Sequence, residues 1–176
     1  MKLVLAVLLF ASPAFAQNKV AAADAMGSCG PREIHFDVKA DKSLHAVTEV
    51  ADGKALVYVI ETQKRDNNLC LGCHVTTKIG VDGKWVGANR GDSFLSFSVD
   101  PGEHHLCINW QSSFDALAKI AAFANFNAEP GKVYFFRVRV VAVHDREGSI
   151  DVESINPDEG RYLVSSSPLS LPRAKS

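Results

Sequence analysis

The sequence predicts an all-β fold, an antiparallel β-sandwich with one short C-terminal helix. Three observations support this prediction: short runs in which apolar and polar residues alternate, turn sequences between those runs, and no regular alternation of strands with helices. Alternation at every second residue is typical of a strand with one buried face. At 176 residues a single domain is expected, and we place the sandwich at residues 33–166.

The first two strands differ in their pattern. Ile34, Phe36 and Val38 alternate with polar residues, which predicts a half-buried strand. Residues 55–61 (ALVYVIE) are almost continuously apolar, as expected of a central strand that is covered on both faces.

The turn sequences predict a series of hairpins. Asp82-Gly83 stands between apolar residues and favours a type I′ turn, because both central positions of that turn need a positive φ. Residues 95–99 and 104–110 alternate on either side of Asp100-Pro101-Gly102-Glu103, which predicts a second hairpin. Glu129-Pro130-Gly131-Lys132 predicts a third, leading into a strong strand at 133–143.

Two helical segments are expected. Apolar residues at helical spacing in 114–121 predict one helical turn near Asp115, followed by a strand from about Ile120. Asn156 has the features of an N-cap, with Pro157 at the first helical position and Glu159 at the capping-box position, so we expect a helix near 157–165, kept short by Gly160. Residues 167–176 are expected to form a flexible tail.

The first 16 residues predict export. Lys2, the apolar run 3–11 and Ala14-Phe15-Ala16 are the three parts of a secretory signal peptide at residues 1–16, with cleavage before Gln17. Residues 17–32 would then be a loosely held N-terminal arm. The apolar run is shorter than the roughly 20 residues that span a bilayer, so we expect no transmembrane segment in the mature chain. The expected location is the periplasm or the extracellular space.

Charge and composition narrow the classes of partner. The chain has 19 Lys and Arg against 20 Asp and Glu, and its longest basic stretch is Lys64-Arg65. Binding of nucleic acid needs clustered basic charge, so we expect no nucleic-acid partner.

Several turn motifs taken together resemble a known family. The segments GKALVYV (53–59), VDGKWVG (81–87), PGEH (101–104), PGKVYF (130–135) and DEGR (158–161) occur in this order. The series resembles the bacterial domain of unknown function 2846 family, over Lys54 to Arg161. The resemblance implies an exported, β-rich protein, often lipoprotein-like, with no established activity, cofactor or catalytic residue. The chain departs from that pattern in lacking a lipobox cysteine and in carrying CLGCH at 70–74.

The CLGCH segment is a literal C-x-x-C-H, the attachment pattern of c-type haem. In that reading Cys70 and Cys73 bond the haem vinyl groups and His74 ligates the iron, with a sixth ligand from Met26, His35, His45, His104, His105 or His144. Against haem, the motif normally opens a helix, whereas the residues after His74 lead into a strand. We therefore expect no cofactor, and keep a small periplasmic c-type haem electron carrier as the alternative.

Other chemistry for the same motif stays open. A thioredoxin-like redox role needs the first cysteine at a helix N-terminus, and a zinc site would need a fourth ligand besides Cys70, Cys73 and His74. We favour disulfides, because four cysteines in an oxidising compartment usually pair. The expected pairs are Cys29–Cys107 and Cys70–Cys73. Cys107 is out of phase with the apolar residues around it, so its side chain should point away from the core. It can then pair with Cys29 if the N-terminal arm crosses the outside of the sheet.

Three further candidates are weaker. Glu103-His104-His105 suggests a metal, but neighbouring strand residues point to opposite faces. Asp115 and His144 could belong to a serine triad, although no nucleophile elbow accompanies them. Trp85, Trp110 and Phe94 could form an exposed aromatic face for a ligand. The expected function is that of an exported, non-enzymatic module that binds a protein or envelope partner.

Overall fold

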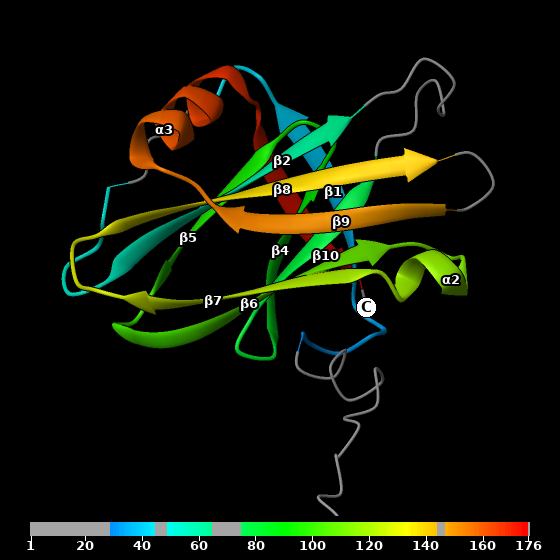
Figure 1. Ribbon diagram of the computed structural model, residues 1–176, viewed down its shortest axis with the longest axis horizontal. Helices are drawn as coiled ribbons and strands as arrows, with labels where there is room; N and C mark the ends of the chain where they lie inside the picture. The colour runs from blue at the N-terminus through cyan, green and yellow to red at the C-terminus, as the bar shows by residue number, and fades with distance from the viewer. Residues whose placement is uncertain (1–28, 45–48, 65–74, 144–146, 176) are drawn as a thin grey trace, which may run out of the picture.

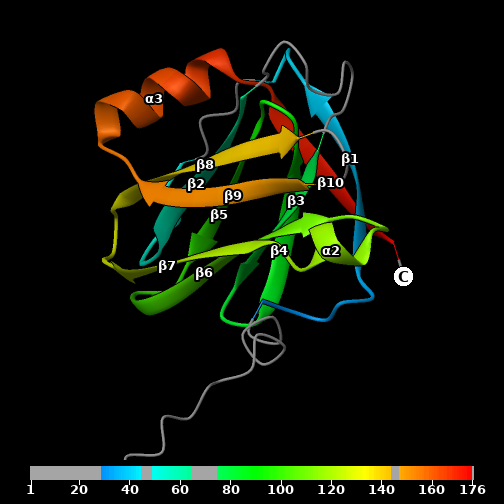
Figure 2. The same cartoon turned by 45° about the vertical axis from the view of Figure 1, so that its right-hand side comes forward.

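Two β-sheets pack face to face in the computed structural model, which describes residues 29–44, 49–64, 75–143 and 147–175 (Figure 1). The predicted signal peptide, most of the N-terminal arm and the CLGCH segment lie outside these residues. Turning the molecule by 45° shows α3 lying across the outside of the larger sheet (Figure 2).

The larger sheet, called sheet A here, has the strand order β1-β10-β5-β2-β8-β9. The smaller sheet, sheet B, has the order β4-β3-β6-β7. The elements run in the chain as β1 (His35–Asp41), β2 (Ala55–Lys64), β3 (Thr76–Val81), β4 (Lys84–Arg90), β5 (Phe94–Val99), β6 (Gly102–Gln111), α2 (Asp115–Ala118), β7 (Ala121–Ala128), β8 (Val133–Val143), β9 (Glu147–Ser154), α3 (Pro157–Ser166) and β10 (Leu169–Lys175).

The predicted fold class is confirmed, with one refinement. Most neighbouring strands are antiparallel, but β2 and β8 pair in parallel from Leu56↔Val133 to Lys64↔Val141, and β10 meets β5 in parallel at Leu169↔Phe94. A parallel pair needs a long connection between its strands. Here that connection is β3 to β7, which includes all of sheet B.

Two of the three predicted hairpins are wrong. Asp82-Gly83 joins paired strands β3 and β4, with φ of 50° and 78°, as the type I′ turn requires. The turns at 100–101 and 129–132 instead carry the chain from one sheet to the other, since β5 and β8 belong to sheet A and β6 and β7 to sheet B. Pro-Gly sequences determine where the chain reverses, but burial of apolar faces determines which strands pair.

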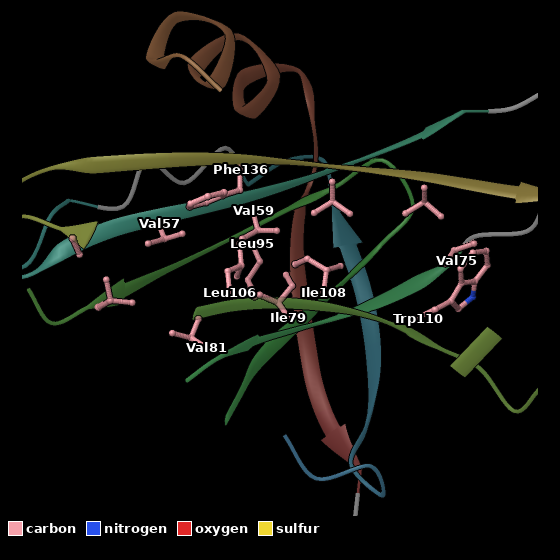
Figure 3. Close-up of a cluster of buried hydrophobic side chains, with 14 of the residues drawn as sticks. Val57, Val59, Val75, Ile79, Val81, Leu95, Leu106, Ile108, Trp110 and Phe136 are labelled. Atoms are coloured by element: carbon pink, nitrogen blue, oxygen red, sulfur yellow. The ribbon is translucent and has the colours of Figure 1, made fainter. Parts of the chain in front are cut away.

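The main core lies between the sheets (Figure 3). Val57 and Val59 of β2 face Ile79 of β3 and Ile108 of β6, and all four are fully buried. A second cluster, which includes Tyr58, Phe94 and Phe135, lies on the other face of sheet A under Val164 of α3. This second layer explains the continuous apolar run of β2, whose residues from Ala55 to Glu61 are all buried, as predicted for a doubly covered strand.

Both helical segments are confirmed. α2 is a single turn that leads into β7, and α3 begins at Pro157. The Asn156 side chain accepts hydrogen bonds from the backbone N–H groups of Asp158 and Glu159. Glu159 forms an ion pair with Arg137 of β8, which ties α3 to sheet A.

The expected flexible tail is wrong. Residues Leu169–Lys175 form β10, which pairs antiparallel with β1 from His35↔Lys175 to Asp41↔Leu169. The polar, proline-containing sequence suggested a tail, but Pro172 is tolerated because β10 pairs with β5 only at Leu169, so the strand has a ladder partner on one side only at Pro172. The sandwich therefore extends beyond residue 166.

Gly160 has a packing role that predicts a stability effect. A Cβ at this position would lie 2.3 Å from Cγ of Phe135, under α3. We expect Gly160→Ala to lower the free energy of unfolding by about 1–3 kcal/mol through overpacking, although alanine is the better helix former. Urea unfolding measures the effect. Tyr162→Ala, on the exposed side of α3, is the control and should change stability little; a stabilised Gly160→Ala protein would contradict the packing role.

Candidate functional site

Residues 29–34, which include the described end of the N-terminal arm predicted at 17–32, lie on the outer face of sheet B and are called the arm below. Cys29 forms a disulfide with Cys107 of β6, with Cα atoms 5.3 Å apart and a sequence separation of 78. Leu106 and Ile108, on either side of Cys107, point into the core. The predicted Cys29–Cys107 pairing and its position outside the sheet are therefore both found.

Two glycines allow the arm to approach the sheet closely. A Cβ on Gly80 of β3 would lie 2.3 Å from the Cys29 carbonyl oxygen, and a Cβ on Gly30 would lie 2.7 Å from Nε1 of Trp85. The Trp85 indole N–H donates to the Pro31 carbonyl at 2.7 Å. The disulfide and the Trp85 hydrogen bond fix the arm over β3 and β4.

A pocket of about 190 Å³ remains where the arm, the end of β6 and α2 meet. Its lining includes Gly30, Arg32, Lys78, Trp85, Asn109 and Asp115. Two polar side chains shape the end of β6: Asn109 donates to the Ala118 and Ile120 carbonyls at 2.9 and 3.0 Å, and Gln111 bonds both the backbone N–H and the carbonyl of Phe36. These hydrogen bonds hold the end of β6 to the α2–β7 segment on one side and to β1 on the other.

Lys78 is the charged group of this outer-face pocket. Its neighbours on β3, Thr77 and Ile79, point into the sandwich, so the Lys78 side chain lies on the outer face of sheet B. The residue is nevertheless only 4% exposed. Its ammonium lies 4.2 Å from the centre of the Trp85 ring and donates to the Ile34 carbonyl at 3.3 Å. Burial lowers the pKa of the Lys78 amino group, while the charge of Glu33 acts in the opposite direction.

The candidate exposed aromatic face does not form. Phe94 is fully buried in the cluster under α3. Trp110 contributes to the pocket lining, but its indole packs inward against Gly148 of β9, within the main core (Figure 3). Of the three aromatic residues, Trp85 alone has its ring on the outer face of sheet B, because its neighbour in register is Gly80, which leaves room for the ring.

A second polar group lies inside the sandwich, near the end of β2. The carboxyl of Glu61 is fully buried and accepts hydrogen bonds from the Thr77 hydroxyl and from Gln63, the latter at 2.9 Å. Burial raises the pKa of Glu61 to about 8, although these two hydrogen bonds act to lower it. Nearby, Asn89 donates to the Val59 carbonyl, and its Oδ1 has no hydrogen-bond partner among the described residues. Glu61 has no exposed surface for a substrate, so we treat it as structural.

A larger and more open hollow, of about 690 Å³, lies between β1, the β4–β5 turn and the link from α3 to β10. Its cationic side chains, Lys39, Lys42 and Arg90, are exposed to solvent. Exposed charges gain little from a bound ion, because water screens them. The smaller pocket, with its buried ammonium, is the stronger candidate site.

His104 and His105, near the start of β6, have structural partners. His104 contacts Asp82 Oδ2 and the Asp100 carbonyl, each at 2.7 Å, so that its ring bridges two turns. Burial lowers the pKa of His104, but these acceptors and the charge of Asp82 raise it more. His105 bonds Asn125 instead. The two rings are not directed at a common ion.

The remaining candidates are not brought together. Asp115 forms an ion pair with Lys119 at 2.5 Å, and His144 lies outside the described residues. Cys70, Cys73 and His74 lie outside them too, as do Met26 and His45. β3 begins at Thr76, so a strand follows the CLGCH segment, as the sequence predicted.

Fold and pocket together define a class: an all-β sandwich with a disulfide-tied arm across one sheet and a small cationic pocket beneath that arm. Comparison with protein-family models, curated proteins and solved structures finds no match. Among the helices in the described part of the chain, none has the length and apolar character needed to cross a bilayer.

Proposed function

We propose that the protein is an exported, non-enzymatic β-sandwich module that binds an envelope component or a protein partner through the outer-face pocket. The signal-like residues 1–16 and the family resemblance support export. One observation carries the binding role: the Lys78 ammonium is buried at the pocket, yet no carboxylate of the described residues lies within ion-pair distance of it. A buried charge without a partner is costly, which favours a ligand that supplies one.

Binding to the envelope tests the proposal. Purified mature protein is mixed with an isolated envelope fraction and the bound share is measured by sedimentation. Ala118→Leu adds apolar volume to the pocket lining without removing any side-chain contact, and we expect it to reduce saturable binding at least about tenfold, a loss of about 1.4 kcal/mol. Tyr162→Ala, on the exposed side of α3, is the control and should bind as the wild type does.

Equal saturable binding by the wild type and Ala118→Leu would show that the pocket is not the binding surface. No saturable binding by the wild type would reject the envelope role. Thermal unfolding of Ala118→Leu is measured in parallel, so that a loss of binding is not confused with a loss of fold.

Export makes a separate prediction. Protein recovered from the periplasmic or extracellular fraction should begin at Gln17, because Ala14-Phe15-Ala16 is the expected cleavage site. Intact-mass spectrometry measures this directly. A recovered chain that still contains residues 1–16 would refute cleavage.

The competing function is that of a small haem electron carrier with haem attached to Cys70 and Cys73 and ligated by His74. The C-x-x-C-H sequence favours it, whereas the strand that follows the motif does not. We expect protein co-expressed with haem-attachment machinery to be colourless. A Soret band that survives denaturation, and that disappears when Cys70 and Cys73 are changed to Ser, would make the haem protein the better account.

A further inference from the structure

We propose that the outer-face pocket binds a carboxylate group, with the Lys78 ammonium as its charge partner. This inference rests on the proposed function and names the chemistry of the ligand.

The Lys78 ammonium has donor capacity to spare. An ammonium carries three N–H donors. One is directed at the Ile34 carbonyl at 3.3 Å, a long hydrogen bond, and the centre of the Trp85 ring lies 4.2 Å from the ammonium. Neither contact supplies a full negative charge, and buried ammonium groups in proteins are usually paired with one. A carboxylate at the pocket would accept the remaining N–H in a charge-assisted hydrogen bond.

The charges around the pocket also favour an anion. Asp115 is the one acid among the described lining residues, and its ion pair with Lys119 at 2.5 Å offsets both charges. Arg32 adds a cation to the lining, but it is exposed, so Lys78 supplies most of the positive charge that a ligand in the pocket would meet. The charge of Glu33 acts to raise the pKa of Lys78, but Glu33 is exposed and makes no ion pair with Lys78. The pocket therefore presents a net positive field around one buried donor.

Size and charge together select a small monoanion. A volume of about 190 Å³ corresponds to roughly six waters at liquid density. A carboxylate with a short aliphatic group fits this volume, and the Trp85 ring offers an apolar wall for that group. A phosphate dianion would bring more charge than a single buried ammonium balances, and its desolvation would be costly.

A titration with acetate tests the ligand class. Acetate is added to mature wild-type protein at constant ionic strength, and the indole N–H resonance of Trp85 is followed, with acetamide as the uncharged analogue of the same shape. We expect acetate to bind saturably and at least about tenfold more tightly than acetamide, because acetamide cannot form the charge-assisted bond. Lys78→Gln should weaken acetate binding at least about tenfold, whereas Lys132→Gln, in the exposed β7–β8 turn, should not.

The acetate and acetamide comparison needs no variant, so it holds even if Lys78→Gln disturbs the arm. Equal affinity for the two compounds, or no saturable shift with acetate, would overturn the carboxylate assignment. Displacement of the protein from the envelope fraction by acetate would show that the envelope presents the carboxylate. Acetate binding without displacement would keep the carboxylate assignment for a free small acid and would reject the pocket as the envelope-binding surface. If Ala118→Leu abolishes envelope binding while acetate does not bind, the ligand class is wrong and the proposed function stands.

Discussion

Glu61→Gln should remove much of the protein's loss of stability on going from mildly acidic to mildly alkaline pH. Glu61 has a pKa of about 8 in the folded chain, because it is fully buried, against 4.5 for the free group. Below pH 4.5 the carboxyl is protonated in both states. Between 4.5 and 8 the folded state holds a proton that the unfolded state releases, so the free energy of unfolding falls as pH rises.

We expect Glu61 to lower the free energy of unfolding by on the order of a few kcal/mol across this pH range, since each unit of pKa difference corresponds to about 1.4 kcal/mol. Glutamine is neutral throughout and has nearly the same shape. It can still accept a hydrogen bond from Gln63 and donate one to the Thr77 hydroxyl. The variant should therefore be close to the wild type at pH 4.5 and clearly more stable than the wild type at pH 8.5.

Urea unfolding at pH 4.5, 6.5 and 8.5 measures this difference. Glu129→Gln, at an exposed turn, is the matched control and should keep the pH dependence of the wild type. Other groups, His104 among them, add their own pH dependence, so the comparison is made between variant and wild type at each pH. Parallel curves for the wild type and Glu61→Gln would show that Glu61 is ionised in the folded protein.

Cys29→Ser should lower the melting temperature far more than Cys73→Ser. The Cys29–Cys107 bond closes a loop of 78 residues. The chain-entropy argument gives about 4–5 kcal/mol for a loop of this length, against less than about 2 kcal/mol for a Cys70–Cys73 ring. For a domain of this size that corresponds to a fall of roughly 10 °C or more.

Calorimetry under non-reducing conditions measures the effect, with Cys73→Ser as the control. The double variant Cys29→Ser/Cys107→Ser should resemble Cys29→Ser, because it removes the same bond and also the unpaired Cys107. Peptide mapping without reduction should recover Cys29 linked to Cys107. An equal fall for Cys29→Ser and Cys73→Ser, or a Cys29 link to Cys70 or Cys73, would contradict the attachment of the arm to β6.

Local sequence signals predicted most of the secondary structure but not all of the strand pairing. The Asp82-Gly83 hairpin, the single turn of α2 and the N-cap of α3 depend on neighbouring residues, and all three were predicted correctly. The parallel β2–β8 pair and the position of β10 depend on contacts between distant segments. No local pattern encodes such contacts, because turn residues specify a reversal and not a partner.

The candidate site was predicted in part. The phase of Cys107 relative to Leu106 and Ile108 placed the disulfide outside the sheet. Lys78 and Glu61 were missed, because a charged residue in a strand is normally assigned to a solvated face. A signal for each was present: Lys78 shares its strand face with Gly80, a position where another segment can cover the sheet, and Glu61 continues the apolar run of a doubly buried strand.

The most direct test of the binding role is the response of the two tryptophans to the envelope fraction. The chain contains two tryptophans, so its spectrum has two indole N–H signals. Trp85 lines the pocket and bonds Pro31 of the arm, whereas Trp110 contributes to the lining but has its ring packed in the core. On adding detergent-solubilised envelope fraction, we expect the Trp85 signal to shift or broaden clearly more than that of Trp110. Saturable binding that leaves the Trp85 signal unchanged would contradict a binding site beneath the N-terminal arm.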